Sequence, residues 1–239
     1  MRSASLVFLI AAGCAQAPLD PPSIPQGGTH IYTGDVRGPD GDPLFRYTRQ
    51  SVTSEAGWTS VHRSREVETD TLVVAQAARH DASYALQRYD EDHRQLGIRS
   101  TVSAANPGRL EFVTQRRNRV RRRSEQIDAP AVTGPTLFGF VTTRWDALAA
   151  GEAVKIRFIV AERRRSYAFT LRMASTDTEH TVVEMRPKSL LLRRALPLMR
   201  MTFDTRSRTI LRYEGRIPPR HDERPVDAHV DYRHHDTFR

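Results

Sequence analysis

Cysteine is almost absent from this chain of 239 residues, because Cys14 is its only cysteine. One cysteine cannot form an intramolecular disulfide, so the folded part of the chain depends on its apolar core for stability. The same scarcity excludes zinc sites built from cysteine pairs and catalysis by a thiol within the folded domain.

Long hydrophobic runs are also missing. The longest apolar stretch follows Arg2, covers residues 6–12 and ends in small residues before Cys14. It is far shorter than the roughly twenty apolar residues that span a bilayer as a helix. A basic start, a short apolar stretch and a small-residue cleavage zone are typical of a secretory signal peptide. The sequence therefore predicts an exported protein.

The ending Ala11-Ala12-Gly13-Cys14 resembles the lipobox of bacterial lipoproteins. The resemblance implies a signal peptide over residues 1–13, cleavage before Cys14 and a lipid on that cysteine. It also implies an exported protein anchored in the outer membrane and facing the periplasm. The departure is Ala11, where leucine is usual. The alternative is ordinary secretion, with cleavage after Ala15 or Ala17 and loss of the cysteine.

Composition along the chain predicts one β-rich domain between two polar segments. Residues 14–28 are rich in proline and end in two glycines, which is typical of an extended linker. Short stretches of alternating polarity then recur at roughly 8–12-residue spacing from residue 29 onwards. We expect the β-rich domain over residues 29–218 and a polar strand or tail over residues 219–239.

The alternating stretches predict an antiparallel sheet that curls toward a barrel or a sandwich. One pair flanks the turn-rich loop at residues 38–43 as a hairpin, and the arginine-rich stretch 117–127 is ambiguous. The remaining predicted strands cover residues 58–67, 71–78, 84–94, 98–104, 109–114, 154–160, 167–173, 181–185, 199–204, 209–214 and 226–232.

One amphipathic helix interrupts the strands. It begins near residues 134–136, and Gly151 ends it. Its apolar residues fall at steps of four, four and three, so they form one stripe that lies across an apolar sheet face. The stripe consists of Leu137, Val141, Trp145 and Leu148. A second, shorter helix or turn is expected over residues 189–195.

Arginine supplies nearly all of the formal net charge of +9, because Lys155 and Lys188 are the only lysines. Outside the cytoplasm this charge favours envelope anions such as lipid headgroups or an anionic polymer, although a codon bias toward arginine is the simpler explanation. The candidate anion contacts are Arg117, Arg119, Arg121, Arg163 and Arg165. The simpler interpretation is a charged edge strand and a hairpin turn. No aromatic residue interrupts the first cluster, so we expect no nucleic-acid binding.

No motif in the sequence predicts catalysis, a cofactor or a metal. The nucleophile elbow, the glycine-rich phosphate loop and the zinc-helix motif are all missing. Asp227, His229 and Asp231 share one face of a predicted strand, but a polar strand face explains them without a metal. The cluster at residues 90–93 is likewise explained by solvation. We expect a noncatalytic protein.

Together the lipobox, the proline linker, the strands and the helix resemble the lipoprotein carriers of the LolA/LolB type. The segment 136–172, with Leu137-Phe138-Gly139-Phe140 and later Tyr167-Ala168-Phe169, also resembles the periplasmic β-domains grouped as DUF3108. These resemblances imply a mainly β fold, in which one or two helices cover the concave face of a strongly curved, half-barrel-like antiparallel sheet.

The carrier resemblance implies a function as well. It places a lipid or another amphiphile under a helical lid formed by Leu137, Val141, Trp145 and Leu148, with arginines at the rim. The alternative is that the helix completes a closed core. The protein would then be a structural or assembly lipoprotein that docks on a protein partner or an anionic envelope polymer through its arginine-rich face.

Overall fold

The computed structural model describes residues 29–38 and 40–237, and most of these residues lie in β-strands whose side chains alternate between buried and exposed. In β12 (His180–Pro187), for example, every second side chain is buried and the others are partly or fully exposed. The preceding strands are β1 (Thr29–Arg37), β2 (Pro43–Ser54), β3 (Gly57–Glu66), β4 (Leu72–His80), β5 (Leu86–His93), β6 (Ile98–Asn106), β7 (Arg109–Arg116), β8 (Arg119–Gln126), β9 (Ala131–Val132), β10 (Val154–Val160) and β11 (Arg165–Thr176). Those that follow are β13 (Met199–Asp204), β14 (Ile210–His221) and β15 (Arg224–Thr237).

These strands form one fifteen-stranded sheet in the order β8-β7-β6-β5-β4-β3-β2-β1-β15-β14-β13-β12-β11-β10-β9. The first and last strands pair with each other at the middle of the sheet, and the chain runs outward from them in both directions. Neighbouring strands are antiparallel except β9 and β10, which are parallel. Strand β8 therefore forms one edge of the sheet and β9 forms the other.

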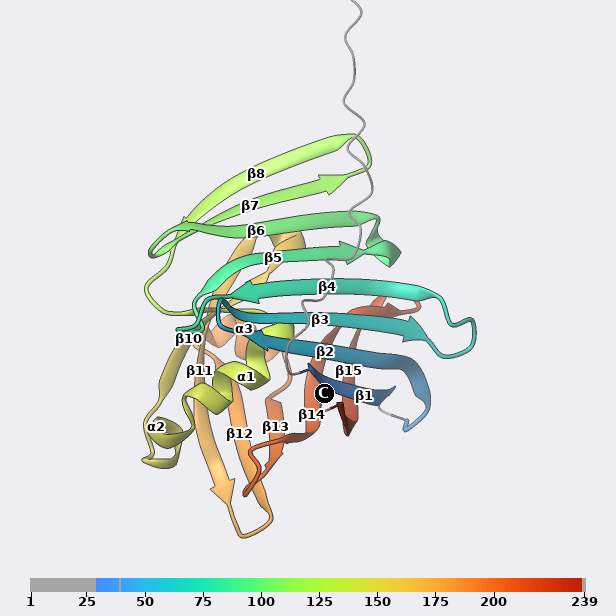
Figure 1. Ribbon diagram of the computed structural model, residues 1–239. Helices are drawn as coiled ribbons and strands as arrows, with labels where there is room; N and C mark the ends of the chain where they lie inside the picture. The colour runs from blue at the N-terminus through green and yellow to red at the C-terminus, as the bar shows by residue number, and fades with distance from the viewer. Residues whose placement is uncertain (1–28, 39, 238–239) are drawn as a thin grey trace, which may run out of the picture.

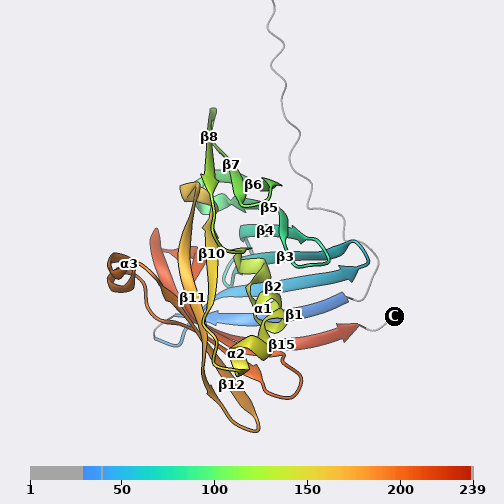
Figure 2. The ribbon, with the colours of Figure 1, turned by 90° about the vertical axis from the view of Figure 1, so that its left-hand side faces the viewer.

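The sheet bends so strongly that its two halves face each other (Figures 1 and 2). Strands β10 to β14 cross behind β1 to β8 instead of continuing their plane. Ile159 near the end of β10 and Ala161 just after it pack against Val102, Leu110 and Phe112 in a buried cluster. This contact between distant parts of the sheet gives the fold its half-barrel shape.

The helices α1 (Leu137–Thr143) and α2 (Trp145–Ala149) lie between the two halves (Figure 2). Hydrogen bonds between Thr133 and Thr136 form a capping box at the 3-10 helix η2 (Gly134–Thr136), which contains Pro135 and leads directly into α1. Six side chains of the two helices are buried, and all belong to the main hydrophobic core. A third helix, α3 (Leu190–Ala195), protrudes at the opposite side of the molecule.

The structure confirms the expected mainly β, strongly curved antiparallel fold with helices on its concave face. The ambiguous stretch 117–127 contains the edge strand β8. The expected boundary at residue 218 falls within β14, and residues 224–237 form β15 at the middle of the sheet. The C-terminal segment is therefore part of the domain, because β1 and β14 both pair with it.

Two further expectations concern the N-terminal region. The predicted signal peptide, Cys14 and the linker over residues 14–28 lie outside the described residues. Within the described part of the chain, no helix is both long enough and apolar enough to cross a membrane.

Candidate functional site

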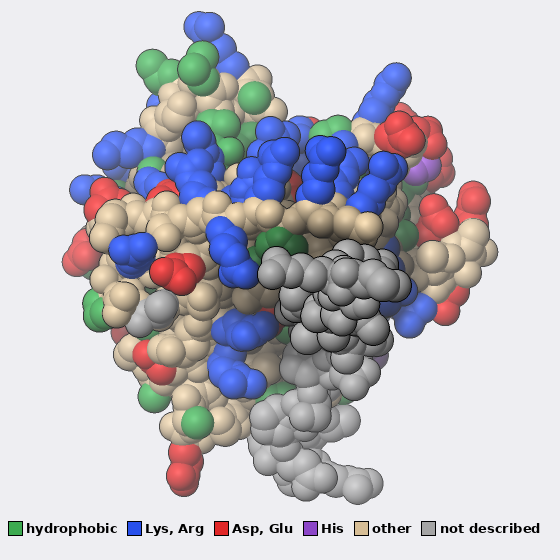
Figure 3. All heavy atoms as spheres, turned by 90° about the horizontal axis from the view of Figure 1, so that it is seen from above, with side chains coloured by type: hydrophobic (Ala, Val, Ile, Leu, Met, Phe, Trp, Pro, Cys, Tyr) green, Lys and Arg blue, Asp and Glu red, His purple; other side chains and the backbone are tan. Residues whose placement is uncertain are grey.

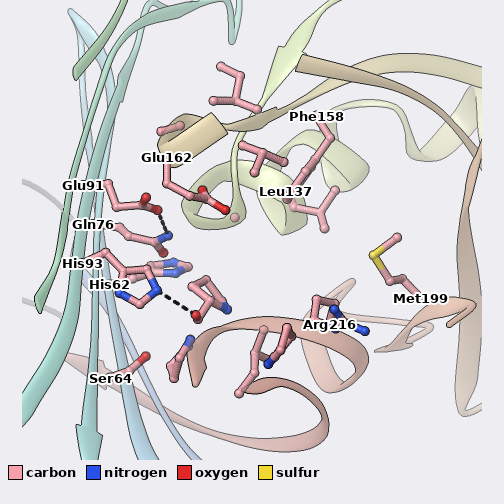
Figure 4. Close-up of a pocket in the computed structure, with 18 of the residues that line it drawn as sticks. His62, Ser64, Gln76, Glu91, His93, Leu137, Phe158, Glu162, Met199 and Arg216 are labelled. Carbon is pink, nitrogen blue, oxygen red and sulfur yellow. Dashed lines mark hydrogen bonds between the residues drawn. The ribbon is translucent and has the colours of Figure 1, made fainter. Parts of the chain in front are cut away.

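A cavity of about 480 Å³ lies between the two halves of the sheet. Side chains from both halves and from the segments around α1 and α3 line it. Figure 4 shows one wall formed by residues of β3 to β5 and the opposite wall formed by residues of β13 and β14. Because these strands are far apart in the sequence, only the bending of the sheet brings the walls together.

The cavity is apolar where it meets α1, β10 and β13. Leu137 and Phe138 reach it from α1, Phe158 from β10 and Met199 from β13. These side chains are continuous with the main hydrophobic core, which packs directly beneath them. This part of the cavity favours hydrocarbon, because apolar side chains line it and a hydrocarbon chain bound there is removed from water.

The wall formed by β4 and β5 is polar and buried. Gln76 donates hydrogen bonds to the Tyr89 hydroxyl at 2.7 Å and to Glu91 Oε2 at 2.8 Å. Tyr89 donates a third hydrogen bond, also to Glu91 Oε2, at 2.7 Å. The other carboxyl oxygen, Glu91 Oε1, is buried without a hydrogen-bond partner. Burial raises the pKa of Glu91, and the hydrogen bonds from Gln76 and Tyr89 oppose that rise.

Two histidines extend this wall. His93 Nε2 lies 3.0 Å from the carbonyl oxygen of Pro218, whereas its Nδ1 is buried and has no partner. The His62 ring is hydrogen bonded to the Tyr47 hydroxyl. Burial lowers the pKa of both rings, and the Arg49 guanidinium lowers that of His62 further. Both histidines are therefore neutral near pH 7.

A second carboxyl group enters the cavity from the 3-10 helix η3 (Ala161–Arg163), which follows β10. Glu162 faces the polar wall from the other half of the sheet (Figure 4). Burial raises its pKa, and the nearby Glu91 carboxyl raises it further. The charge of Glu91 thus disfavours ionisation of Glu162.

The structure separates the four predicted lid residues. Leu137 lines the cavity, whereas Val141, Trp145 and Leu148 do not. Those three are buried in the core between the sheet halves, with exposed fractions of 0%, 7% and 0%. Most of the helical stripe therefore packs the core, as in the alternative of a closed core, and its N-terminal end faces the cavity.

The predicted anion contacts divide into two groups. Arg117, Arg119 and Arg121 line a second cavity of about 720 Å³ beside the edge strand β8, and Arg164 joins them there. Arg163 instead lines the first cavity, and the exposed Arg165 lines neither. Lys and Arg side chains gather in a row along the top of the molecule, the side on which β8 lies (Figure 3).

The polar face of β15 has structural partners. Asp227 pairs with Arg216, and Asp231 Oδ1 lies 2.6 Å from Arg212 Nε. His229 Nδ1 lies 3.1 Å from Glu214 Oε1. All three partners are on β14, so cross-strand pairing accounts for this row. Among the described residues, no group of three or more histidines and acids is placed to hold a metal ion.

Sequence reasoning missed the polar wall of the first cavity. The strand containing Gln76 was expected, but its polar side chain was not assigned to the interior. Glu91 and His93 were attributed to a solvated stretch, yet their exposed fractions are only 7% and 3%. The available signal was their spacing at alternate positions with Tyr89, which places all three on one face of β5.

Comparison with known proteins supports the fold. No protein-family model matches this chain, and no curated protein matches it. A similar solved structure is a beta-barrel-like protein of a domain of unknown function, DUF1849, from Brucella abortus. The two chains are 10% identical with a TM-score of 0.50, over 88% of this chain and 99% of that chain. At this identity the likeness shows a common curved β fold and carries no function.

Proposed function

We propose that this protein is a noncatalytic, membrane-anchored envelope lipoprotein that binds a lipid or another amphiphile in the cavity between its sheet halves. The observation that carries the proposal is the two-sided lining of that cavity. Leu137, Phe138 and Phe158 offer an apolar side, and Gln76 and Glu91 offer a buried polar side. A ligand with a hydrocarbon part and a polar part matches both.

The size of the cavity supports binding of a small ligand. Its volume of about 480 Å³ lies within the range of roughly 300–1,000 Å³ that is usual for ligand sites. A single acyl chain with a compact head group fits such a volume. Burying its methylene groups would stabilise the complex by about 0.8 kcal/mol each.

The surroundings of α3 suggest how a ligand reaches the cavity. Leu192, Ala195 and Leu196 line the cavity, whereas Leu190 and Leu191 face solvent with exposed fractions of 72% and 77%. Arg193 and Arg194 follow in the last turn of the same helix. Exposed leucines beside arginines are suited to contact with an anionic lipid surface.

The anchor belongs to the same proposal. A lipid on Cys14 would hold the domain at the outer membrane, facing the periplasm, with residues 14–28 as the linker. Metabolic labelling with a clickable fatty acid tests this point. We expect label on the natural chain and none on Cys14→Ser, and label that persists on Cys14→Ser would contradict lipidation at this residue.

Native mass spectrometry of the gently extracted protein tests amphiphile binding. We expect a bound mass that a denaturing solvent releases, and uptake of added single-chain lipid by the stripped protein. The variant Leu137→Trp fills the apolar side of the cavity and should lower uptake at least about ten-fold. Leu148→Met, a near-isosteric change in the core, is the matched control. If no lipid copurifies with the protein and the protein takes up no added lipid, the proposal is refuted.

A second candidate function rests on the cavity beside β8. Arg117, Arg119, Arg121 and Arg164 line it together, and Glu162 is the only acidic side chain among the described residues that line it. None of these four arginines forms an ion pair within the described ranges 29–38 and 40–237. This arrangement supports docking on an anionic envelope polymer or an acidic protein partner.

A further inference from the structure

The polar end of the first cavity holds two carboxyl groups that lack a cationic partner. Glu91 comes from β5 and Glu162 from η3, so they approach from the two halves of the sheet. In the part of the chain that the structure describes, neither forms an ion pair. Burying a carboxylate without a cationic partner costs free energy, and burying two of them near each other costs more.

The unsatisfied atoms here are all able to accept a hydrogen bond. Glu91 Oε1 is buried without a partner and is an acceptor when the carboxyl group is ionised. His93 places Nε2 3.0 Å from the Pro218 carbonyl oxygen, so that nitrogen is the donor and the unpartnered Nδ1 is an acceptor. The Glu162 carboxylate adds further acceptor oxygens. Figure 4 shows these three side chains around the same end of the cavity.

The cations of the cavity wall are engaged or solvated. Arg216 is paired with Asp227, and Arg220 Nη1 donates to the carbonyl oxygen of Glu223 at 2.8 Å. Arg163 is exposed and follows Glu162 directly in the chain, where its charge partly offsets that of the carboxylate. The cations near the polar end are therefore already engaged or exposed, whereas Glu91 Oε1 and His93 Nδ1 remain buried without a partner.

We propose that the cavity selects amphiphiles whose head group is a protonated amine, bound between Glu91, Glu162 and His93 Nδ1. An alkylammonium group supplies one positive charge and three N–H donors, which matches the charge and the acceptors at this end. Its hydrocarbon chain occupies the side formed by Leu137 and Phe158. This inference rests on the proposed function, because it names the class of amphiphile.

Three probes with the same hydrocarbon chain test the selection: dodecylammonium, dodecanol and dodecanoate. Each is titrated into the full-length protein at pH 7.5, and its dissociation constant is measured by displacement of a neutral fluorescent probe. We expect dodecylammonium to bind about ten-fold more tightly than dodecanol and dodecanoate to bind most weakly. A ten-fold ratio corresponds to about 1.4 kcal/mol.

Variants locate the selection. Glu91→Gln keeps the shape of the side chain but removes its charge, so it should abolish most of the preference for dodecylammonium and leave dodecanol binding within about two-fold. Glu162→Gln, in the 3-10 helix η3, should act in the same direction and replaces Glu91→Gln in the test if that variant does not fold. Glu111→Gln is the control, because Glu111 lies outside both cavities beside Arg109.

The outcomes separate the two proposals. Equal affinities for the three probes, or tightest binding of dodecanoate, would overturn the amine inference and leave amphiphile binding intact. A preference for dodecylammonium that persists in both glutamine variants would also overturn it. Failure of all three probes to bind would refute the proposed function, and the inference with it.

Discussion

Glu125 on β8 and Arg157 on β10 form an ion pair with 2.6 Å between Oε1 and Nη2. The pair joins opposite ends of the strand order, because β8 is one edge and β10 lies next to the other edge. Ser166 adds hydrogen bonds from its backbone N–H at 3.0 Å and its hydroxyl at 2.7 Å. Burial alone would raise the pKa of Glu125, but these partners lower it. The cluster therefore holds the edge strand β8 against β10 and stabilises the half-barrel.

We expect Glu125→Ala to lower the free energy of unfolding by about 2–3 kcal/mol, because it leaves the half-buried Arg157 without its partner. Urea unfolding followed by circular dichroism measures the change. Asp231→Ala breaks a pair with Arg212 in which both side chains are about half exposed, and it should cost less than about 1 kcal/mol. Equal losses in the two variants would show that Glu125 does not fasten the sheet.

Gly139 in α1 is required by the approach of Tyr84. A Cβ atom at this position would lie 1.9 Å from the Tyr84 hydroxyl oxygen. Tyr84 cannot easily retreat, because its hydroxyl donates to the Thr136 carbonyl oxygen at 3.0 Å and its ring stacks on His80. We expect Gly139→Ala to destabilise the protein by about 1–3 kcal/mol in urea unfolding.

A double-mutant cycle checks the cause. Tyr84→Phe removes the hydroxyl oxygen, so Gly139→Ala should cost less in that background than in the natural chain. An identical cost in both backgrounds would mean that the contact with Tyr84 is not responsible.

Acid should destabilise the fold through His80. Burial lowers the pKa of His80 from 6.5 to about 4, and Asp81 opposes this only in part. Between these two pH values the unfolded chain binds more protons than the folded protein, so the free energy of unfolding falls as the pH falls. The buried His62 acts in the same direction. Glu91 and Glu162 act in the opposite direction, because their pKa values are raised.

His80→Phe isolates this contribution, because it keeps a ring against Tyr84 and cannot bind a proton. We expect the natural chain to lose about 2–3 kcal/mol relative to His80→Phe between pH 7 and pH 4. Urea unfolding at both pH values measures the difference. A constant difference would contradict the assignment to His80.

The arginines beside β8 should bind polyanions as a group. We expect the triple change Arg117→Gln, Arg119→Gln and Arg121→Gln to weaken binding of polyphosphate at least about ten-fold and to reduce its dependence on salt. The control removes three exposed arginines elsewhere: Arg172→Gln, Arg206→Gln and Arg224→Gln. Calorimetry at two salt concentrations measures both. Equal weakening would show that only net charge matters.

The exposed leucines of α3 should speed exchange with membranes. We expect Leu190→Ser with Leu191→Ser to slow transfer of a fluorescent amphiphile from anionic vesicles several-fold, because less apolar surface enters the lipid. Its equilibrium affinity for the cavity should stay within about two-fold. Val120→Ser removes another exposed apolar side chain, 52% exposed on β8, and should leave the rate unchanged. A similar rate in both variants would exclude a role for α3.

The sequence by itself determined the local structure. Alternating polarity placed most of the strands, because it depends on neighbouring residues. Apolar steps of four, four and three placed the helical segment from Leu137 to Leu148, which the structure divides at Arg144 into α1 and α2. The C-terminal strand was also visible, but its position between β1 and β14 was not. Strand order depends on pairing between residues that are far apart in the sequence, for which no local pattern exists.

Only the tertiary structure decided the site. In the folded protein Val141, Trp145 and Leu148 are buried in the core and Leu137 lines the cavity. Which side of a helix is buried, and how deeply, depends on the elements that pack around it. It also buried Glu91 and His93 and brought Glu162 opposite them across the bent sheet. Charged residues are usually exposed to solvent, so the sequence predicted exposure for these side chains. They are buried because the curvature of the sheet brings its two halves together.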